Sequence, residues 1–222
     1  MIGFFDYTVW LTYMSLLSAG AGILVSLDGD GHPYWGTFFL LFCGLCDAFD
    51  GKVARTKKNR TETENKFGIQ IDSLSDLVAF GVLPVCIGMA MVRRSNLMDT
   101  RPVIGFILAG VMLLYLLAGM IRLAYFNVTE EERQKKEKGV RRTYLGLPIT
   151  SAALIFPTVM LIQFISKNVD ITPVYFGVAL LMGVLFLSKI RIGKPGLKGI
   201  LLMVAIGAAE FLIMTLMYFI NG

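Results

Sequence analysis

The sequence predicts an all-α, polytopic integral membrane protein: a helical bundle with a six-helix core and one additional C-terminal transmembrane helix. Hydrophobic residues make up 55% of the 222 residues, and the mean hydropathy is +0.67. Seven apolar stretches approach or exceed the length that a helix needs to cross a bilayer. We find neither soluble linkers nor low-complexity tracts nor convincing internal repeats. We therefore expect one transmembrane domain over residues 1–222.

The apolar stretches define the expected helices. They lie at 7–27, 34–55, 68–92, 102–127, 148–167, 173–190 and 197–220. The sixth is short and the first can begin with an interfacial helix, so six to eight crossings are open. The core would cover about 7–190, and the helix at 197–220 would be additional. This last helix carries Glu210 within the membrane, for which helix pairing or a dimer contact is the first explanation.

The basic residues predict the orientation in the membrane. Six Lys or Arg lie at 52–66, seven at 122–142 and four at 189–198, all on alternate connections. The remaining four, Arg93, Arg94, Arg101 and Lys167, fall on the other side. Because basic loops stay in the cytoplasm, we expect an inner-membrane protein whose strongly basic side faces the cytoplasm. Topology and attraction to anionic lipids account for the net charge of +5, so no nucleic-acid partner is implied.

Four aspartates lie inside two of these apolar stretches. Asp47 and Asp50 are three residues apart, and Asp72 and Asp76 are four apart, so each pair shares one helix face. Counted from the loop at 56–67, both pairs lie roughly 6–12 Å below the same surface at a rise of about 1.5 Å per residue. If the two helices are antiparallel neighbours, all four carboxylates converge near the cytoplasmic surface.

Carboxylates at this depth predict a metal site. An ionised carboxylate in an apolar helix is costly unless it pairs with a base or a metal ion, and here carboxylates outnumber the nearby cations. The only histidine, His32, falls in a predicted external loop. Cys43, Cys46 and Cys86 are expected to be small buried hydrophobes. Oxygen ligands are therefore left, and they favour Mg²⁺ or Mn²⁺.

The number of carboxylates fits a binuclear site. Two hard divalent ions commonly clamp a phosphate during displacement at phosphorus. We predict Asp47, Asp50 and Asp72 as ligands. Asp76, the deepest on its helix, is the candidate general base and is also counted among the metal-binding residues.

Basic residues near this cluster suit a diphosphate substrate. Lys52, Arg55 and Arg122 are the nearest by predicted depth. For Arg55, interfacial snorkelling is an equally open explanation. Arg122 begins the polar end of an apolar helix, Arg122-Leu-Ala-Tyr-Phe-Asn127, and polar groups at that depth favour contact with substrate.

Small residues adjoin the carboxylates and allow two interpretations. Gly51 and Ala54 follow Asp50, and Gly68 lies one turn before Asp72. Close helix packing explains such residues in many membrane proteins. Alternatively, a flat ligand group approaches the backbone there, and the four neighbouring carboxylates favour this second interpretation.

The complete pattern resembles the signature of a known family, the CDP-alcohol phosphotransferases. The residues that carry the resemblance are Asp47-x-x-Asp50-Gly51-x-x-Ala54-Arg55 and Gly68-x-x-x-Asp72-x-x-x-Asp76. Further segments are similar to its phosphatidylserine synthase branch: Phe67-Gly68-Ile-Gln70-Ile-Asp72-Ser73-Leu74, Phe80-Gly81-Val-Leu-Pro84, Arg122-Leu-Ala-Tyr-Phe126-Asn127 and Gly146-Leu147-Pro148. The resemblance runs from about 47 to 148, with a looser likeness around Leu11-Thr12.

The resemblance implies a six-helix core and a two-metal enzyme. The donor would be CDP-diacylglycerol, drawn from the surrounding membrane lipids, and the acceptor would be L-serine, with release of CMP. Asp50, Gly51, Ala54 and Gly68 would line the nucleotide site, with Thr12 and Ser15 as further candidates. Arg122, Asn127 and neighbouring basic residues would contact phosphate or substrate. Members of the family form homodimers, so the resemblance also implies a homodimer.

Two departures from the family pattern stand out. Twelve residues separate Arg55 from Gly68, which is longer than the family spacing, and we expect the polar insertion around 61–65 to extend the cytoplasmic loop. Ser15 stands where the branch usually has an asparagine.

Other acceptor alcohols and other classes of protein are alternatives to this interpretation. Glycerol phosphate or inositol phosphate would need clustered arginines, and the basic segment at 133–142 reads as a solvated loop. A cation or proton transporter would also use intramembrane carboxylates. However, a transport path distributes polar residues across the bilayer, whereas these cluster near one surface. A purely structural protein would be destabilised by four buried carboxylates that lack a ligand.

Overall fold

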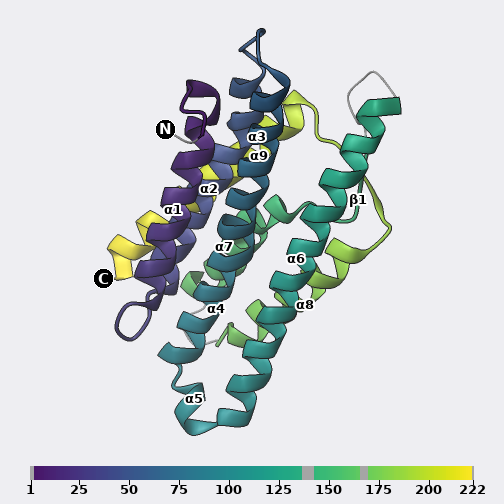
Figure 1. The fold of residues 1–222 in the computed structure, drawn as a ribbon. Coiled ribbons are helices and arrows are strands. Elements are labelled where there is room, and N and C mark those ends of the chain that lie inside the picture. Colours follow the sequence, from purple (N-terminus) through teal and green to yellow (C-terminus); the bar gives the residue numbers. More distant parts are fainter. Residues whose placement is uncertain (1–2, 137–142, 166–169, 222) are drawn as a thin grey trace.

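The computed structural model describes residues 3–136, 143–165 and 170–221, and these form a bundle of helices (Figure 1). The helices in chain order are η1 (Tyr7–Val9), α1 (Trp10–Leu27), α2 (Pro33–Ala54), α3 (Glu62–Asp76), the π-helical segment η2 (Leu77–Val82), α4 (Leu83–Arg94), α5 (Leu97–Thr100), α6 (Pro102–Lys136), η3 (Ile149–Ser151), α7 (Ala152–Ile165), α8 (Thr172–Leu187) and α9 (Leu197–Asn221). The all-α prediction is confirmed. The sequence did not predict one short antiparallel pair, in which Tyr144 of β1 (Thr143–Leu145) lies opposite Ile192 of β2 (Arg191–Gly193).

Helix length and apolarity identify an integral membrane protein. Within the described residues, four stretches are long and apolar enough to span a bilayer: Tyr7–Leu27, Glu62–Arg94, Pro102–Arg133 and Leu197–Met217. The six-helix count is not confirmed by this measure. Two further apolar helices, α7 and α8, contain 14 and 16 residues, and the 22 residues of α2 include Asp47, Asp50 and Lys52.

The path of the chain places the basic connections together. The α2–α3 connection, the C-terminal end of α6 and the segment before α9 lie at one end of the bundle, and α5 lies at the other (Figure 1). Lys167 and the basic residues at 138–142 lie outside the described residues. For the described part of the chain, the arrangement agrees with alternate connections on the same side.

The core forms where α4 meets α2, α6 and α8. Leu40, Phe80, Ile87 and Met112 are fully buried there. Glycines allow other helices to approach closely: a Cβ on Gly44 of α2 would lie only 2.5 Å from the Cβ of Ala153 of α7. Such small-residue contacts are typical of helix interfaces in membranes.

The second aspartate helix begins earlier than the sequence analysis expected. We predicted a start at Gly68 with a longer loop before it, whereas α3 begins at Glu62. The hydroxyl of Thr61 accepts a hydrogen bond from the Glu64 backbone N–H at 3.1 Å, and the Glu64 carboxylate accepts one from the Thr61 N–H at 2.7 Å. This capping box satisfies otherwise free donors, so the polar insertion becomes a helical turn.

Helix α6 extends past its expected end for a related reason. The prediction ended this helix at 127 and assigned a solvated loop to the charged residues after it, whereas α6 continues to Lys136. Glu130 and Arg133 form an ion pair at 2.6 Å, and Glu131 and Lys135 form one at 2.9 Å. Spacings of three and four residues bring opposite charges together on a helix, so the alternating charges support helical structure.

The C-terminal helix α9 packs against α7 and α2. Its Glu210 is 5% exposed and forms a hydrogen bond with the hydroxyl of Thr158 on α7. The Thr158 hydroxyl also donates to the Leu154 carbonyl at 2.8 Å. This contact with α7 supports helix pairing, one of the two explanations that the sequence suggested for Glu210, and the dimer contact stays a prediction.

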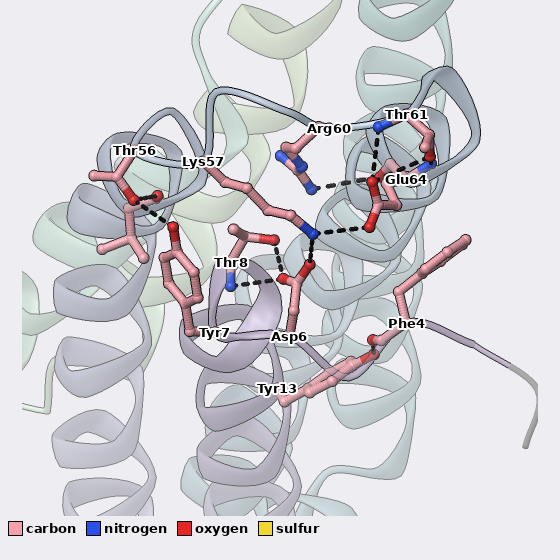
Figure 2. Close-up of polar contacts among 11 residues, drawn as sticks. Phe4, Asp6, Tyr7, Thr8, Tyr13, Thr56, Lys57, Arg60, Thr61 and Glu64 are labelled. Carbon is pink, nitrogen blue, oxygen red and sulfur yellow. Dashed lines mark hydrogen bonds and ion pairs between the residues drawn. The ribbon is translucent and has the colours of Figure 1, made fainter.

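An ion-pair clamp fastens the N-terminal segment to the loop between the aspartate helices (Figure 2). The Lys57 ammonium lies 2.6 Å from Asp6 Oδ2 and 2.8 Å from Glu64 Oε1. The hydrogen bond from Lys57, assisted by Thr8, lowers the pKa of Asp6 to about 2. The same bond to Asp6, followed by the bond to Glu64, raises the pKa of Lys57. The clamp therefore fixes the loop that joins α2 to α3.

The contact between Gly44 and Ala153 predicts a compensating pair of substitutions. Gly44→Ala should lower the free energy of unfolding by about 1–3 kcal/mol, because two Cβ atoms would overlap. Adding Ala153→Gly should restore stability, as measured by thermal unfolding in detergent. Gly177→Ala is the matched control, because its Cβ would meet nothing within 4 Å. Wild-type stability of Gly44→Ala would contradict this account of the α2–α7 contact.

The clamp predicts a pH dependence of stability. Because the pKa of Asp6 falls from 3.8 to about 2 on folding, its stabilising contribution is fully present above pH 3.8 and is lost as the pH falls through about 2. Between these values Asp6→Asn should lose less thermal stability than the wild type. The control is Asp30→Asn, which alters an exposed carboxyl outside the ion pairs of the described chain. Identical acid unfolding curves for wild type and Asp6→Asn would rule the clamp out as the cause.

Candidate active site

Helices α2 and α3 bring the predicted carboxylates together. One carboxylate oxygen each from Asp47, Asp50 and Asp72 can be chosen so that all three lie within 4.8 Å of one another. Asp50 is 9% exposed and the other two are half-buried. The i,i+3 spacing on α2 and the packing of α3 beside the same bundle explain the convergence. The predicted meeting of the two aspartate helices is therefore confirmed for these three side chains.

Asp76 lies beside this group rather than within it. It is the last residue of α3, and its carboxylate interacts electrostatically with all three clustered aspartates and with the Arg122 guanidinium. Asp76 lies next to the predicted metal ligands and one turn further along α3, which is a suitable position for a general base. Its role as the base stays a prediction.

The donor set fits hard divalent cations. The ion pairs identified in the described chain join other residues, and the Arg122 guanidinium is a cation that interacts electrostatically with Asp76. Clustered carboxylates repel one another and are poorly solvated, which bound cations would relieve. Carboxylate oxygens are the ligands that Mg²⁺ and Mn²⁺ prefer. His32 lies at the opposite end of α2 from the carboxylates.

The glycines near the carboxylates lie beneath cationic side chains. A Cβ on Gly51 would meet the Arg55 guanidinium, at 3.7 Å, and the atoms nearest to a Cβ on Gly68 belong to the Arg60 guanidinium, at 2.8 Å. By contrast, a Cβ on Gly44 would strike another helix. Flexible cationic side chains therefore lie over Gly51 and Gly68. This arrangement favours the interpretation that a ligand approaches the backbone there.

Arg60 is a candidate binding residue that the sequence analysis missed. Its guanidinium lies over Gly68, one turn before Asp72, and its Nε is buried with no hydrogen-bond partner in the described chain. Its Nη2 donates a long bond of 3.4 Å to the Glu64 carbonyl (Figure 2). Six basic residues lie at 52–66, and nothing in their order along the chain distinguishes the one that turns back over the site.

The other predicted basic residues differ in placement. Arg55, the C-cap of α2, folds back over Gly51. The Lys52 ammonium lies 5.1 Å from the centre of the Phe49 ring. Ala54 is half-buried at the end of α2. No contact tests the assigned roles of these residues, which stay predictions.

Arg122 and Asn127 lie on α6 and reach toward the carboxylate helices. Arg122 does not end its helix as predicted, because α6 continues to Lys136. It is 6% exposed and its Nε donates to the Leu147 carbonyl at 3.1 Å. The Asn127 amide donates to the Ser73 hydroxyl, next to Asp72, at 2.8 Å.

Thr12 and Ser15 bring α1 to the same region. The Ser75 hydroxyl, next to Asp76, donates to the Thr12 carbonyl at 3.2 Å. The Cys43 thiol, one turn before Asp47, donates to the Ser15 carbonyl at 3.3 Å. The Ser15 hydroxyl is buried and has no partner in the described chain. Both residues therefore lie against the aspartate helices, and their nucleotide role stays a prediction.

Comparison with known proteins agrees with this geometry. Residues 7–219 match the family model described as CDP-alcohol phosphatidyltransferase. The chain is 34% identical over 151 residues to the CDP-diacylglycerol–serine O-phosphatidyltransferase of Helicobacter pylori strain J99, covering 66% of this chain and 55% of that protein. The protein of the same name from Saccharomyces cerevisiae is 34% identical over 156 residues, covering 68% and 51%.

An archaeal relative has a related name. The archaetidylserine synthase of Methanothermobacter thermautotrophicus is 34% identical over 157 residues, covering 69% of this chain and 58% of that protein. The chain thus spans about half the length of the curated relatives it matches. With a family match over nearly its whole length and an aspartate cluster at the family's motif, the chain belongs to the CDP-alcohol phosphatidyltransferase family.

Proposed function

We propose that this protein transfers the phosphatidyl group from CDP-diacylglycerol to L-serine, giving phosphatidylserine and CMP. The observation that carries the proposal is the cluster of Asp47, Asp50 and Asp72, whose carboxylate oxygens lie within 4.8 Å of one another, with guanidinium groups over the neighbouring Gly51 and Gly68. Carboxylates that hold cations, beside arginines that hold anions, suit a diphosphate. The names of the relatives support serine as the acceptor.

The proposed reaction is a displacement at the lipid-linked phosphorus. Asp47, Asp50 and Asp72 would hold two Mg²⁺ or Mn²⁺ ions, with Asp76 near enough to assist. The metal ions would neutralise charge on the diphosphate. Asp76 would accept the proton of the serine hydroxyl, whose oxygen forms the new bond to phosphorus while the bond to the CMP oxygen breaks.

The side chains around the carboxylates would bind the nucleotide and the phosphates. Gly51, Ala54 and Gly68 would leave room for the cytidine, and Arg55 and Arg60 would then face its phosphates. Arg122 and Asn127 would hold the phosphate or the acceptor from the α6 side. Positioning and charge neutralisation would supply most of the rate enhancement, as in other phosphoryl transfers.

The membrane location also belongs to the proposal. The basic loop at 52–66 would keep the site at the cytoplasmic face of the inner membrane. The acyl chains of the donor would remain in the bilayer while its headgroup enters the site. A homodimer, as the family resemblance implies, completes the proposed assembly.

The acceptor is tested by supplying one alcohol at a time. Purified protein with CDP-diacylglycerol, Mn²⁺ and L-serine should release CMP and form phosphatidylserine, whereas glycerol phosphate and inositol phosphate should give only background release. CMP release with one of the phosphorylated acceptors but not with serine would overturn the choice of acceptor. An Asp76-dependent ion flux without CMP release would instead indicate a transporter.

The carboxylate roles are tested by separating turnover from metal binding. Asp76→Asn should lower kcat by about 10²–10⁴-fold, the usual contribution of a general base, and retain Mn²⁺ binding measured by electron paramagnetic resonance. Asp50→Asn should weaken Mn²⁺ binding and turnover together. Asp99→Asn, an exposed carboxyl of α5 at the other end of the bundle, is the control. Near wild-type kcat in Asp76→Asn would exclude it as the base.

A further inference from the structure

A proline interrupts the helix just after the candidate base. Asp76 is followed directly by the π-helical segment η2, and Pro84 lies at the start of α4. Proline has no backbone N–H, so the carbonyl of Phe80, four residues earlier, cannot accept the usual α-helical hydrogen bond. The wider turn is visible where the Leu83 N–H bonds to the Val78 carbonyl, five residues earlier. Phe80 is fully buried, so water does not replace the missing donor.

A tyrosine from another helix supplies that donor. The hydroxyl of Tyr115 on α6 donates to the Phe80 carbonyl at 2.6 Å, and Tyr115 is 1% exposed. Its ring packs edge-on against Phe156 of α7, with 5.6 Å between ring centroids, and at a tilt against Phe186 of α8, with 5.5 Å between centroids. Packing against α7 and α8 therefore holds the hydroxyl at the carbonyl whose α-helical donor, four residues on, is replaced by Pro84.

A second buried tyrosine provides a natural comparison. The hydroxyl of Tyr175 on α8 donates to the Pro84 carbonyl at 2.8 Å. That carbonyl lies inside α4, where a helical N–H also reaches it. The two hydroxyls are equally buried and lie on the same bent segment, but only that of Tyr115 bonds to a carbonyl that proline has deprived of its α-helical donor.

We infer that Tyr115 is a positioning residue for Asp76: its hydrogen bond to the Phe80 carbonyl keeps η2 in its wide π-helical form. The inference rests on the proposed role of Asp76 as the base. Returning η2 to a regular α-helix would change the register by one residue. Such a change turns Asp76 by about 100° about the helix axis relative to α4. Because Asp72 lies on the same helix, both α3 carboxylates would then turn away from Asp47 and Asp50. Wide turns of this kind are frequent at functional sites.

The test uses a substitution that removes only the hydroxyl. Tyr115→Phe should lower kcat by on the order of tenfold or more, because a small displacement of a reacting group is costly. The affinity for Mn²⁺ should fall as well, because Asp72 lies on the same helix as Asp76 and turns with it. Tyr175→Phe, which loses an equally buried hydroxyl, should keep wild-type kcat. A wild-type kcat in Tyr115→Phe, or an equal loss in Tyr175→Phe, would overturn the inference.

A double variant separates positioning from simple stabilisation. Pro84→Ala supplies an N–H that can satisfy the Phe80 carbonyl by an ordinary α-helical bond. Tyr115→Phe combined with Pro84→Ala should therefore recover thermal stability relative to Tyr115→Phe without recovering kcat. If kcat returns together with stability, Tyr115 has a merely structural role.

A measurement independent of turnover distinguishes this inference from the proposed function. Absence of CMP release by the wild type with any acceptor would refute the proposed function alone. Hydrogen exchange of the amides at 77–83 reports on η2 in either case. These amides should exchange faster in Tyr115→Phe than in the wild type or in Tyr175→Phe. If these amides exchange at the wild-type rate in Tyr115→Phe, the Tyr115 hydroxyl does not stabilise the π-helical form of η2.

Discussion

Electrostatic repulsion among buried carboxylates sets the main constraint on this bundle. Asp47, Asp50 and Asp72 place oxygen atoms within 4.8 Å of one another, and the ion pairs identified in the described chain join other residues. Like charges at such separations in a poorly solvated site disfavour one another strongly. Bound divalent cations reverse the sign of the interaction. The helices around the cluster must therefore be held in place by contacts made elsewhere in the bundle.

The glycines on and beside the aspartate helices have two different kinds of neighbour. At Gly44, the missing side chain lets α2 approach Ala153 of α7, which fixes the helix that carries Asp47 and Asp50. At Gly51 and Gly68, the nearest groups are the guanidiniums of Arg55 and Arg60. The same residue type thus allows close helix contact in one place and lies beneath flexible cationic side chains in the other.

The carboxylates on α3 are held from two ends. At the loop end, the Thr61 capping box and the clamp of Asp6, Lys57 and Glu64 fix the first turns of the helix. At the deep end, the π-helical segment η2 and the hydroxyl of Tyr115 fix the residues that follow Asp76. Rigid support on both sides is what a preorganised site requires, because a reacting group that is misplaced by about 1 Å loses much of its effect.

The sequence alone determined the helical class, the pairing of aspartates on two helix faces and the preference for oxygen-bound metals. These follow from local rules: apolar length, the spacing of three or four residues that sets a helix face, and ligand chemistry. The start of α3 was also predictable from local sequence, because Thr61 and Glu64 have the spacing of a capping box. The polar composition of the segment instead favoured the prediction of a loop.

The tertiary structure decided which side chains from distant segments meet. Arg60 over Gly68, Lys57 between Asp6 and Glu64, and Tyr115 at the Phe80 carbonyl each join residues from separate elements. Such contacts depend on how helices pack and how a loop turns back, and these depend on the sum of many weak interactions along the whole chain. The spacing of residues along the sequence does not reveal the outcome of these many weak interactions. Only the folded bundle therefore shows which arginine lies over Gly68 and which hydroxyl bonds to the Phe80 carbonyl.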